Sequence, residues 1–223
     1  MKSPFITFRD LGGFVLLILL ATTGCTSVHG QVPAFSGDSS TAATKGKETA
    51  VLAGGCFWGV DAVFKHVKGV KSVESGYSGG NADTAQYETV STGTTGHAES
   101  VKISFDPSQV SFAQLLRIYF SVATDPTQLN RQGPDTGTQY RGVIFYTSDE
   151  QRKVAEAYID QLNKARVFSG PIVTQVVPFK AFFTAEDYHQ NYLALHPSQP
   201  YIVFNDLPKL HALQKEFPDI YKK

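Results

Sequence analysis

The six residues Gly54-Gly55-Cys56-Phe57-Trp58-Gly59 decide how the rest of the chain is interpreted. The apolar run at 50–53 precedes them and predicts a short buried strand, and apolar residues at positions 57, 60, 64 and 67 follow the period of a helix. The glycine pair suits a sharp turn between the two. Cys56 is therefore expected in the first helical turn, where unpaired N–H groups and the helix dipole lower a thiol pKa and favour the nucleophilic thiolate.

Cys56 also has a plainer interpretation, because a lone cysteine is more often an inert, buried packing residue. The chain holds only two cysteines, Cys25 and Cys56, and a single tryptophan, Trp58. The glycine turn, the helix start and the aromatic pair Phe57 and Trp58, which are able to wall a pocket, favour the reactive interpretation.

Six further segments in order, together with the Gly-Cys-Phe-Trp-Gly stretch, carry a family resemblance. They are Gly76-Tyr77-Ser78-Gly79-Gly80, Thr95-Gly96-His97-Ala98-Glu99, Asp125-Pro126-Thr127, Asn130-Arg131-Gln132-Gly133 with Asp135, Gly137-Thr138-Gln139-Tyr140-Arg141, and Ala185-Glu186-Asp187-Tyr188-His189-Gln190. From about residue 49 to the C-terminus the chain resembles the A-type peptide methionine sulfoxide reductases. It departs from the family pattern at Asp61, where Glu is common, at Thr124, where His is usual, and at Gly142, where Ser is common.

The N-terminus has the layout of a secretory signal peptide, with Lys2 and Arg9 ahead of an apolar run at 14–21 that is too short to span a bilayer. The run ends at Thr22-Thr23-Gly24-Cys25, which resembles a bacterial lipoprotein cleavage box with Cys25 as the lipidated first residue. An ordinary signal cleaved nearby and an uncleaved anchor remain open, since Thr22 departs from the usual aliphatic residue. The resemblance implies an exported, membrane-anchored protein that faces the periplasm or the cell exterior.

The predicted organisation is a signal peptide at 1–24, the lipidation site and a flexible tether at 25–48, and a catalytic domain at 49–223. The tether is expected because residues 26–48 are rich in Ser, Thr, Gly and Ala and show no periodicity. Lys+Arg and Asp+Glu both number 20, so no net charge would attract nucleic acid.

The domain is predicted to be α+β, a ferredoxin-like split β-α-β core with a mixed or antiparallel sheet and long functional loops. The predicted strands are 50–53, 70–77, 97–105, 140–146 and 172–177, and the predicted helices are 57–67, 112–122 and 150–165. Residues 81–96 and 125–139 are expected to be loops that are too long for mere connections. Residues 178–223 are expected to hold a short helical segment near 187–195 and a proline-containing C-terminal wrap.

Glu99 is the candidate proton donor. It shares a strand face with Val101, Ile103 and Phe105, and apolar surroundings raise a carboxyl pKa and keep the group protonated near neutrality. A strand-end glutamate that is exposed or paired with arginine is the alternative. The resemblance places Glu99 at the position of the family's acid.

The remaining site residues are selected by the resemblance. Tyr87 and Tyr140 would donate hydrogen bonds to a sulfoxide oxygen, and Asp135 would orient a water or the substrate amide. Phe57 and Trp58 would hold the S-methyl group of the substrate. Without the resemblance, each of these side chains is more simply a packing or turn residue. His189 is interpreted as a structural hydrogen-bonding residue.

The predicted reaction is reduction of the S epimer of methionine sulfoxide, with Cys56 oxidised to a sulfenic acid. Family members often resolve this acid with a C-terminal cysteine, and residues 198–223 contain none. An external thiol, such as a thioredoxin-like protein or a small thiol, or else an unmodified Cys25, is therefore expected as reductant. We expect no metal, flavin or nicotinamide, because metal-ligand spacing and nucleotide-binding glycine motifs do not occur in the sequence. A monomer is expected.

Two competing functions are considered. A cysteine hydrolase would need a histidine paired with Cys56, for which His97 is the candidate. A surface-anchored peptide-binding domain with a vestigial thiol site would be non-catalytic, and the intact set of Cys56, Glu99, Tyr87 and Tyr140 argues against it.

Overall fold

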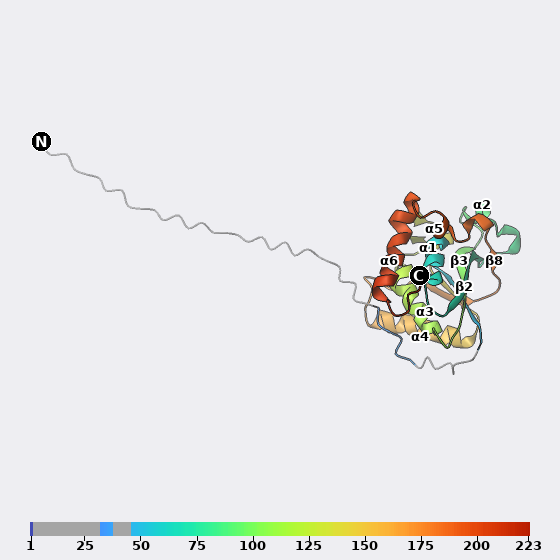
Figure 1. The fold of residues 1–223 in the computed structure, drawn as a ribbon, viewed down its shortest axis with the longest axis horizontal. Coiled ribbons are helices and arrows are strands. Elements are labelled where there is room, and N and C mark those ends of the chain that lie inside the picture. The colour runs from blue at the N-terminus through green and yellow to red at the C-terminus, as the bar shows by residue number, and fades with distance from the viewer. Residues whose placement is uncertain (2–31, 38–45) are drawn as a thin grey trace.

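The computed structural model describes residues 1, 32–37 and 46–223 (Figure 1). A six-stranded sheet has the strand order β7-β6-β1-β3-β2-β8. Its strands are β1 (Glu48–Ala53), β2 (Val70–Ser78), β3 (Ala98–Phe105), β6 (Val143–Tyr146), β7 (Gln175–Pro178) and β8 (Phe183–Thr184), and a separate hairpin joins β4 (Arg131–Gln132) to β5 (Asp135–Thr136). The helices are α1 (Phe57–Lys65), α2 (Tyr87–Val90), α3 (Phe112–Ile118), α4 (Asp149–Lys164), α5 (Tyr192–Leu195) and α6 (Leu207–Glu216).

The centre of the sheet is built from two interleaved β-α-β units. β3 pairs antiparallel with both β1 and β2, so β1 and β2 run parallel with β3 between them, and α1 connects them. In the same way, β1 lies between β3 and β6, which α3 and the segments after it connect. The predicted α+β fold with a ferredoxin-like split core is confirmed, and a parallel β7 and a short antiparallel β8 extend its edges.

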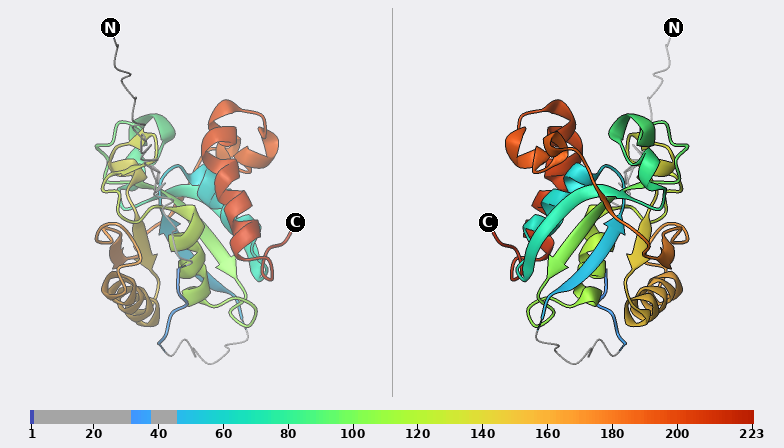
Figure 2. Two further views of the ribbon diagram at one scale, coloured as in Figure 1. Left: turned by 90° about the vertical axis from the view of Figure 1, so that its left-hand side faces the viewer. Right: turned by 90° about the vertical axis from the view of Figure 1, so that its right-hand side faces the viewer.

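One face of the sheet carries the longer helices α1, α3, α4 and α6, as the two side views show (Figure 2). Leu52, Ile103 and Ile144 pack there against the buried faces of these helices. The opposite face is covered by the segment that leads from β7 to β8, in which Phe179 and Phe182 pack against buried strand residues. Both faces of the central strands are therefore shielded from water.

The predicted alternation along β3 is confirmed. Glu99, Val101, Ile103 and Phe105 all lie buried, and the three apolar residues belong to the main core on the helical side. Ala98 belongs to the cluster on the other face. Glu99 therefore points toward the side of the sheet on which α1 packs.

Two strands begin later in the sequence than predicted. The strand expected at 140–146 begins at Val143, because Thr138–Tyr140 forms a 3-10 turn. The strand expected at 172–177 begins only at Gln175. The helix predicted at 112–122 is α3 followed by a π-helical turn at Tyr119–Ala123, and Ser111 caps it as expected, with Gln114 completing a capping box.

The expected C-terminal wrap is largely helical. A π-helical turn at Ile202–Asp206 leads directly into α6, and Pro208, in the first turn of α6, has no N–H to donate to the helical turn before it. α6 packs against α1, and its Leu213 is fully buried. No helix within the described ranges is long and apolar enough to cross a membrane.

Residues 32–37 fall within the expected tether, yet the chain here is held to the domain. Val32 is buried, its carbonyl accepts a hydrogen bond from Arg117, and the carbonyl of Pro33 accepts one from Tyr158. Phe35 makes an edge-to-face contact with the Tyr158 ring. A flexible tether is therefore not what these six residues form, and the rest of the predicted segment lies outside the described residues.

Candidate active site

Cys56 lies at the turn that joins β1 to α1, as the glycine pair predicts. Gly55 adopts a positive φ of 93°, and a side chain there would collide with Gln132. Cys56 is the residue immediately before α1, at the N-cap, and is only 7% exposed. The expected position inside the first helical turn is therefore wrong by one residue.

The thiol environment differs from the expectation. Burial raises the pKa of the Cys56 thiol well above its ordinary value, and the nearby carboxyl groups of Glu99 and Asp206 raise it further. The backbone N–H of Trp58 and the Lys209 ammonium act in the opposite direction but are outweighed. The helix start does favour the thiolate, as predicted, but desolvation dominates, so the resting thiol keeps its proton.

Glu99 lies in β3 beside this thiol. Its side chain is nearly fully buried, and its Oε2 accepts a hydrogen bond of 3.0 Å from the backbone N–H of Phe57. Burial raises the pKa of Glu99 from 4.5 to about 8, with Asp135 and Asp206 adding to the shift and the Phe57 N–H opposing it. The carboxyl group is therefore protonated at neutral pH, and the exposed or arginine-paired alternative does not apply.

Trp58 is fixed from several sides. Its ring stacks on Tyr192, with centroids 3.7 Å apart and planes 6° from parallel, and Tyr201 meets it edge-on. Its indole N–H donates a hydrogen bond of 3.1 Å to Nδ1 of His189. Phe57 is fully buried and also contacts the His189 ring.

His189 has the structural role that we expected. Because Nδ1 accepts from the Trp58 indole, the ring proton lies on Nε2. Burial lowers the pKa of His189, which keeps the ring neutral. The ring also packs against Tyr87 at a centroid separation of 4.5 Å. His189 thereby joins the tryptophan to one of the two candidate oxygen-binding tyrosines.

Tyr87 and Tyr140 come from the two segments that were expected to be long loops. Tyr87 begins the short helix α2, and its backbone N–H donates to Glu186 at 2.9 Å. Tyr140 ends the 3-10 turn before β6. Burial raises the pKa of both phenols, and the charges of Glu99 and Cys56 raise it further. The two tyrosines therefore share one site with the thiol and the carboxyl group.

Asp135 lies in the β4–β5 hairpin and accepts a hydrogen bond from the hydroxyl of Tyr201. Because the Tyr201 ring meets Trp58 edge-on, this hydrogen bond places Asp135 in the same site. The structure thus brings together all seven candidate residues of the domain. They are Cys56, Phe57, Trp58, Tyr87, Glu99, Asp135 and Tyr140. Cys25, the candidate lipidation residue, lies outside the described residues.

Four residues of the site were not predicted. Tyr201, Asp206 and Lys209 belong to the C-terminal segment, which contains no recognised motif, and Glu186 lies in a quoted motif without an assigned role. Glu186 accepts from the hydroxyl of Tyr77 and from the backbone of Tyr87. The one available signal for the C-terminal residues was the pattern of aromatic and charged residues at 201–209. This pattern does not indicate which residues of the domain they contact.

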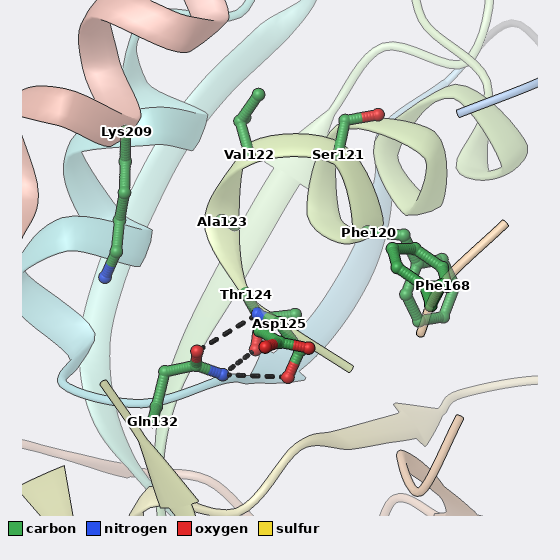
Figure 3. A pocket seen from close by; sticks show the side chains of 9 residues that line it. All are labelled: Phe120, Ser121, Val122, Ala123, Thr124, Asp125, Gln132, Phe168 and Lys209. Atoms are coloured by element: carbon green, nitrogen blue, oxygen red, sulfur yellow. Dashed lines mark hydrogen bonds between the residues drawn. The ribbon is translucent and has the colours of Figure 1, made fainter. Parts of the chain in front are cut away.

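A cavity of about 270 Å³ flanks the glycine turn (Figure 3). The residues that line it include Phe120, Thr124, Asp125, Gln132, Phe168 and Lys209. The amide of Gln132 bridges Thr124 and the backbone of Asp125, and the same side chain covers Gly55. Thr124 thus accepts a hydrogen bond from the Gln132 side chain that covers Gly55, and it also lies next to Gly54.

His97 does not support the hydrolase alternative. It is buried, its Nδ1 accepts from the backbone N–H of Gly80 at 3.2 Å, and its Nε2 lies 2.9 Å from the carbonyl of Asn81. Both ring nitrogens are thus engaged by the backbone, so His97 is not a base for Cys56. Among the residues that the structure describes, no group of three or more His, Cys, Asp or Glu side chains is arranged to hold a metal ion.

A split β-α-β fold with a buried thiol beside a protonated carboxyl group defines an enzyme of thiol chemistry, and comparison with known proteins identifies its family. The family model described as "Peptide methionine sulfoxide reductase" matches residues 48–220. The chain belongs to the peptide methionine sulfoxide reductase family.

Curated relatives and solved structures agree with this assignment. The chain is 59% identical to peptide methionine sulfoxide reductase MsrA 2 of Mesorhizobium japonicum over 81% of this chain and 93% of the relative. It is 54% identical to MsrA 2 of Synechocystis over 80% of this chain and 83% of the relative. The solved methionine sulfoxide reductase A of Corynebacterium diphtheriae superposes with a TM-score of 0.60 at 34% identity, covering 75% of this chain and 84% of that one.

Proposed function

We propose that the chain reduces the S epimer of methionine sulfoxide, free or within proteins, with Cys56 as nucleophile and Glu99 as acid. The observation that carries the proposal is the hydrogen bond from the backbone N–H of Phe57 to the Glu99 carboxyl group. It holds a protonated carboxyl group against the residue that follows the thiol. Sulfoxide oxygen is a poor leaving group until it is protonated, so a thiol alone would react slowly.

The proposed step transfers the substrate oxygen to Cys56. Cys56 attacks the sulfoxide sulfur as a thiolate while Glu99 gives its proton to the oxygen. The attack forms an S–S bond between Cys56 and the substrate sulfur. The protonated oxygen then passes to the Cys56 sulfur as hydroxide while the S–S bond breaks, so the thioether leaves with the bonding electron pair and Cys56 becomes a sulfenic acid. The proton lost by the thiol replaces the one that Glu99 gave away, which restores the protonated carboxyl group.

The neighbouring side chains supply binding and orientation. The phenol groups of Tyr87 and Tyr140 keep their protons and can donate to the sulfoxide oxygen. Phe57 and Trp58 offer apolar surface for the S-methyl group, and the contacts of Trp58 with Tyr192 and His189 fix its orientation. Asp135, held by Tyr201, is suited to orienting a water molecule or the substrate amide.

The sulfenic acid requires a reductant from outside the domain, since the chain has no cysteine after Cys56. An external thiol condenses with it to a mixed disulfide and releases water, and a second thiol releases Cys56. A thioredoxin-like protein or a small thiol fits this chemistry, and an unmodified Cys25 is the alternative. The proposed enzyme uses no prosthetic cofactor and acts as a monomer.

The proposed location rests on the sequence of the N-terminus. Cleavage before Cys25 and lipidation of that residue would place the enzyme at a membrane, facing the periplasm or the exterior. Labelling of cells with a radioactive fatty acid tests this, since the wild-type chain should carry label and C25S should not. Equal label on both chains would overturn the lipid assignment without affecting the proposed chemistry.

The decisive test is a single turnover of the full chain, without reductant, on separate S and R epimers of N-acetylmethionine sulfoxide. About one equivalent of thioether per protein is expected from the S epimer and none from R. Peptide mass spectrometry should find the sulfenic acid on Cys56 after trapping with dimedone, and Cys56→Ser should give no product. Product from both epimers, or product from C56S, would overturn the proposal.

A further inference from the structure

Asp206 and Lys209 form an ion pair at the start of α1 that none of the assigned roles explains. Both come from the C-terminal segment, and Lys209 Nζ lies 3.2 Å from Asp206 Oδ1. The Asp206 side chain is fully buried, and 19% of the Lys209 side chain is exposed at the cavity beside the glycine turn. Figure 3 shows Lys209 extending from its helix toward α1 at the edge of that cavity.

Gly59 shows how closely the pair approaches the first turn of α1. A Cβ at this position would lie 2.1 Å from Asp206 Oδ1 and 2.9 Å from Lys209 Nζ. Glycine is unfavourable within a helix, and here only its missing side chain leaves room for the two charged groups. Gly59 is three residues after Cys56, so the pair lies against the turn that begins at the thiol.

The charges around this turn are mostly acidic. The groups that face Cys56 from the surrounding elements are Glu99 from β3, Tyr87 from α2, Tyr140 from the turn before β6, and Tyr201, Asp206 and Lys209 from the C-terminal segment. Asp135 faces Glu99 and Asp206. Lys209 is the cation of this set, and Asp206 Oδ2 has no hydrogen-bond partner among the described residues.

We propose that Asp206 and Lys209 are positioning residues for sulfoxide reduction, a buried pair whose opposite charges act on Cys56 across the first turn of α1. The inference rests on the proposed function of Cys56 as nucleophile. Lys209 stabilises the thiolate as it forms, and Asp206 holds Lys209 in the position from which it does so. Asp206 alone opposes the thiolate, so the two members have opposite effects on the thiol.

The test measures the pH dependence of Cys56 alkylation by iodoacetamide in the full-length chain, with Cys56 and Cys25 distinguished by peptide mass spectrometry. Lys209→Met should raise the apparent pKa of Cys56 by about 1. Asp206→Asn should lower it, and the double variant should lie between the two. Lys65→Met, which breaks the Asp61–Lys65 pair of 2.8 Å on the same helix, is the matched control and should leave the curve unchanged.

A merely structural pair gives a different pattern. If the ion pair only holds α6 against α1, each variant loosens the site and exposes the thiol, so every apparent pKa falls and the double variant falls furthest. That result would overturn the proposal. Should K209M not fold, Lys209→Gln keeps a hydrogen-bonding group for Asp206 without the charge, and it must also raise the apparent pKa.

The same variants separate this inference from the proposed function. In single turnovers with the S sulfoxide, K209M should shift the rise of the rate with pH to higher pH, with substrate affinity unchanged. Alkylation requires no sulfoxide, so it measures the Cys56 pKa whether or not the enzyme reduces sulfoxides. If K209M and D206N shift this pKa in opposite directions but the wild-type chain reduces neither epimer, the proposed function is overturned and the proposed effect of the charge pair on Cys56 stands. If the wild-type chain reduces the S sulfoxide but the two variants do not shift the Cys56 pKa in opposite directions, only the proposed role of the charge pair is overturned.

Discussion

The backbone N–H of Phe57 and the Glu99 carboxyl group share a buried hydrogen bond of 3.0 Å, which joins the start of α1 to the middle of the sheet. The bond stabilises the charged form of Glu99, yet burial outweighs it and the pKa rises to about 8. The proposed acid is therefore a group that keeps its proton at neutral pH and donates it only to a stronger base, such as the developing negative charge on the sulfoxide oxygen.

The first prediction concerns this proton. Glu99→Gln should slow the single-turnover reduction about 10²- to 10⁴-fold below pH 7, which is the usual contribution of a positioned acid. Because the Glu99 carboxylate raises the pKa of Cys56, the fraction of Cys56 thiolate is measured in each enzyme by iodoacetamide alkylation, and the ratio of wild-type to E99Q rates is taken per thiolate. The ratio should fall about tenfold per pH unit above pH 8, as the carboxyl group loses its proton. A ratio that stays constant to pH 9.5 would contradict the assignment.

The same shift predicts how folding stability depends on pH. The folded state raises the pKa of Glu99 from 4.5 to about 8, so between these values it binds a proton that the unfolded chain has released. The contribution of Glu99 to the unfolding free energy is therefore fully present below pH 4.5. It is lost as pH rises toward 8, and the loss amounts to about 5 kcal/mol at most. E99Q has no carboxyl group at this position and does not lose this contribution, so its unfolding free energy relative to wild type should increase from pH 5 to pH 8. Urea titrations at both pH values check this, and an equal difference at the two would refute it.

Trp58 gives a spectroscopic test of the aromatic site, because it is the only tryptophan in the chain. His189→Ala removes the acceptor of the indole N–H and a ring that Phe57 and Tyr87 contact. The Trp58 emission should shift to longer wavelength, and the KM for the sulfoxide should rise several-fold with a smaller change in kcat.

His189→Asn retains an acceptor near the position of Nδ1 and is expected to preserve more of the wild-type emission than H189A. His66→Ala, at a histidine that stacks on Tyr221, is the matched control and should not change the emission. If H189A emits at the wild-type wavelength, His189 does not fix the tryptophan.

The glycine turn, the β3 alternation and the order of elements were predictable because each depends on local sequence. Gly55 needs its positive φ, and the period of two in β3 is visible in the sequence itself. The long-range family motifs then identified which tyrosines and carboxylates meet at the turn. The structure brings them together as that resemblance implies, with Tyr87 and Tyr140 beside Glu99.

The thiol pKa and the C-terminal half of the site were not predictable in the same way. The effect of the helix start on Cys56 is local, whereas the opposing desolvation comes from side chains that are distant in sequence, such as Glu99 and Asp206. Residues 178–223 were predicted to end in a proline-containing wrap, and the helix α6 in this segment was not predicted. The docking of residues 32–37 likewise depends on Tyr158 and Arg117, which composition alone does not reveal.

The last prediction concerns these docked residues. Val32 is 5% exposed, and Val32→Ala removes two buried carbon atoms, so it should lower the unfolding free energy by about 1.5 kcal/mol. Val203→Ala is the matched control, because Val203 is 40% exposed and its loss should cost much less. The measurement is urea unfolding of the full chain, with limited proteolysis to follow cleavage near residue 32. If V32A is as stable as V203A and is cleaved no faster than wild type, the docked segment contributes nothing to the fold, and residues 32–37 would behave as the tether that their composition suggests.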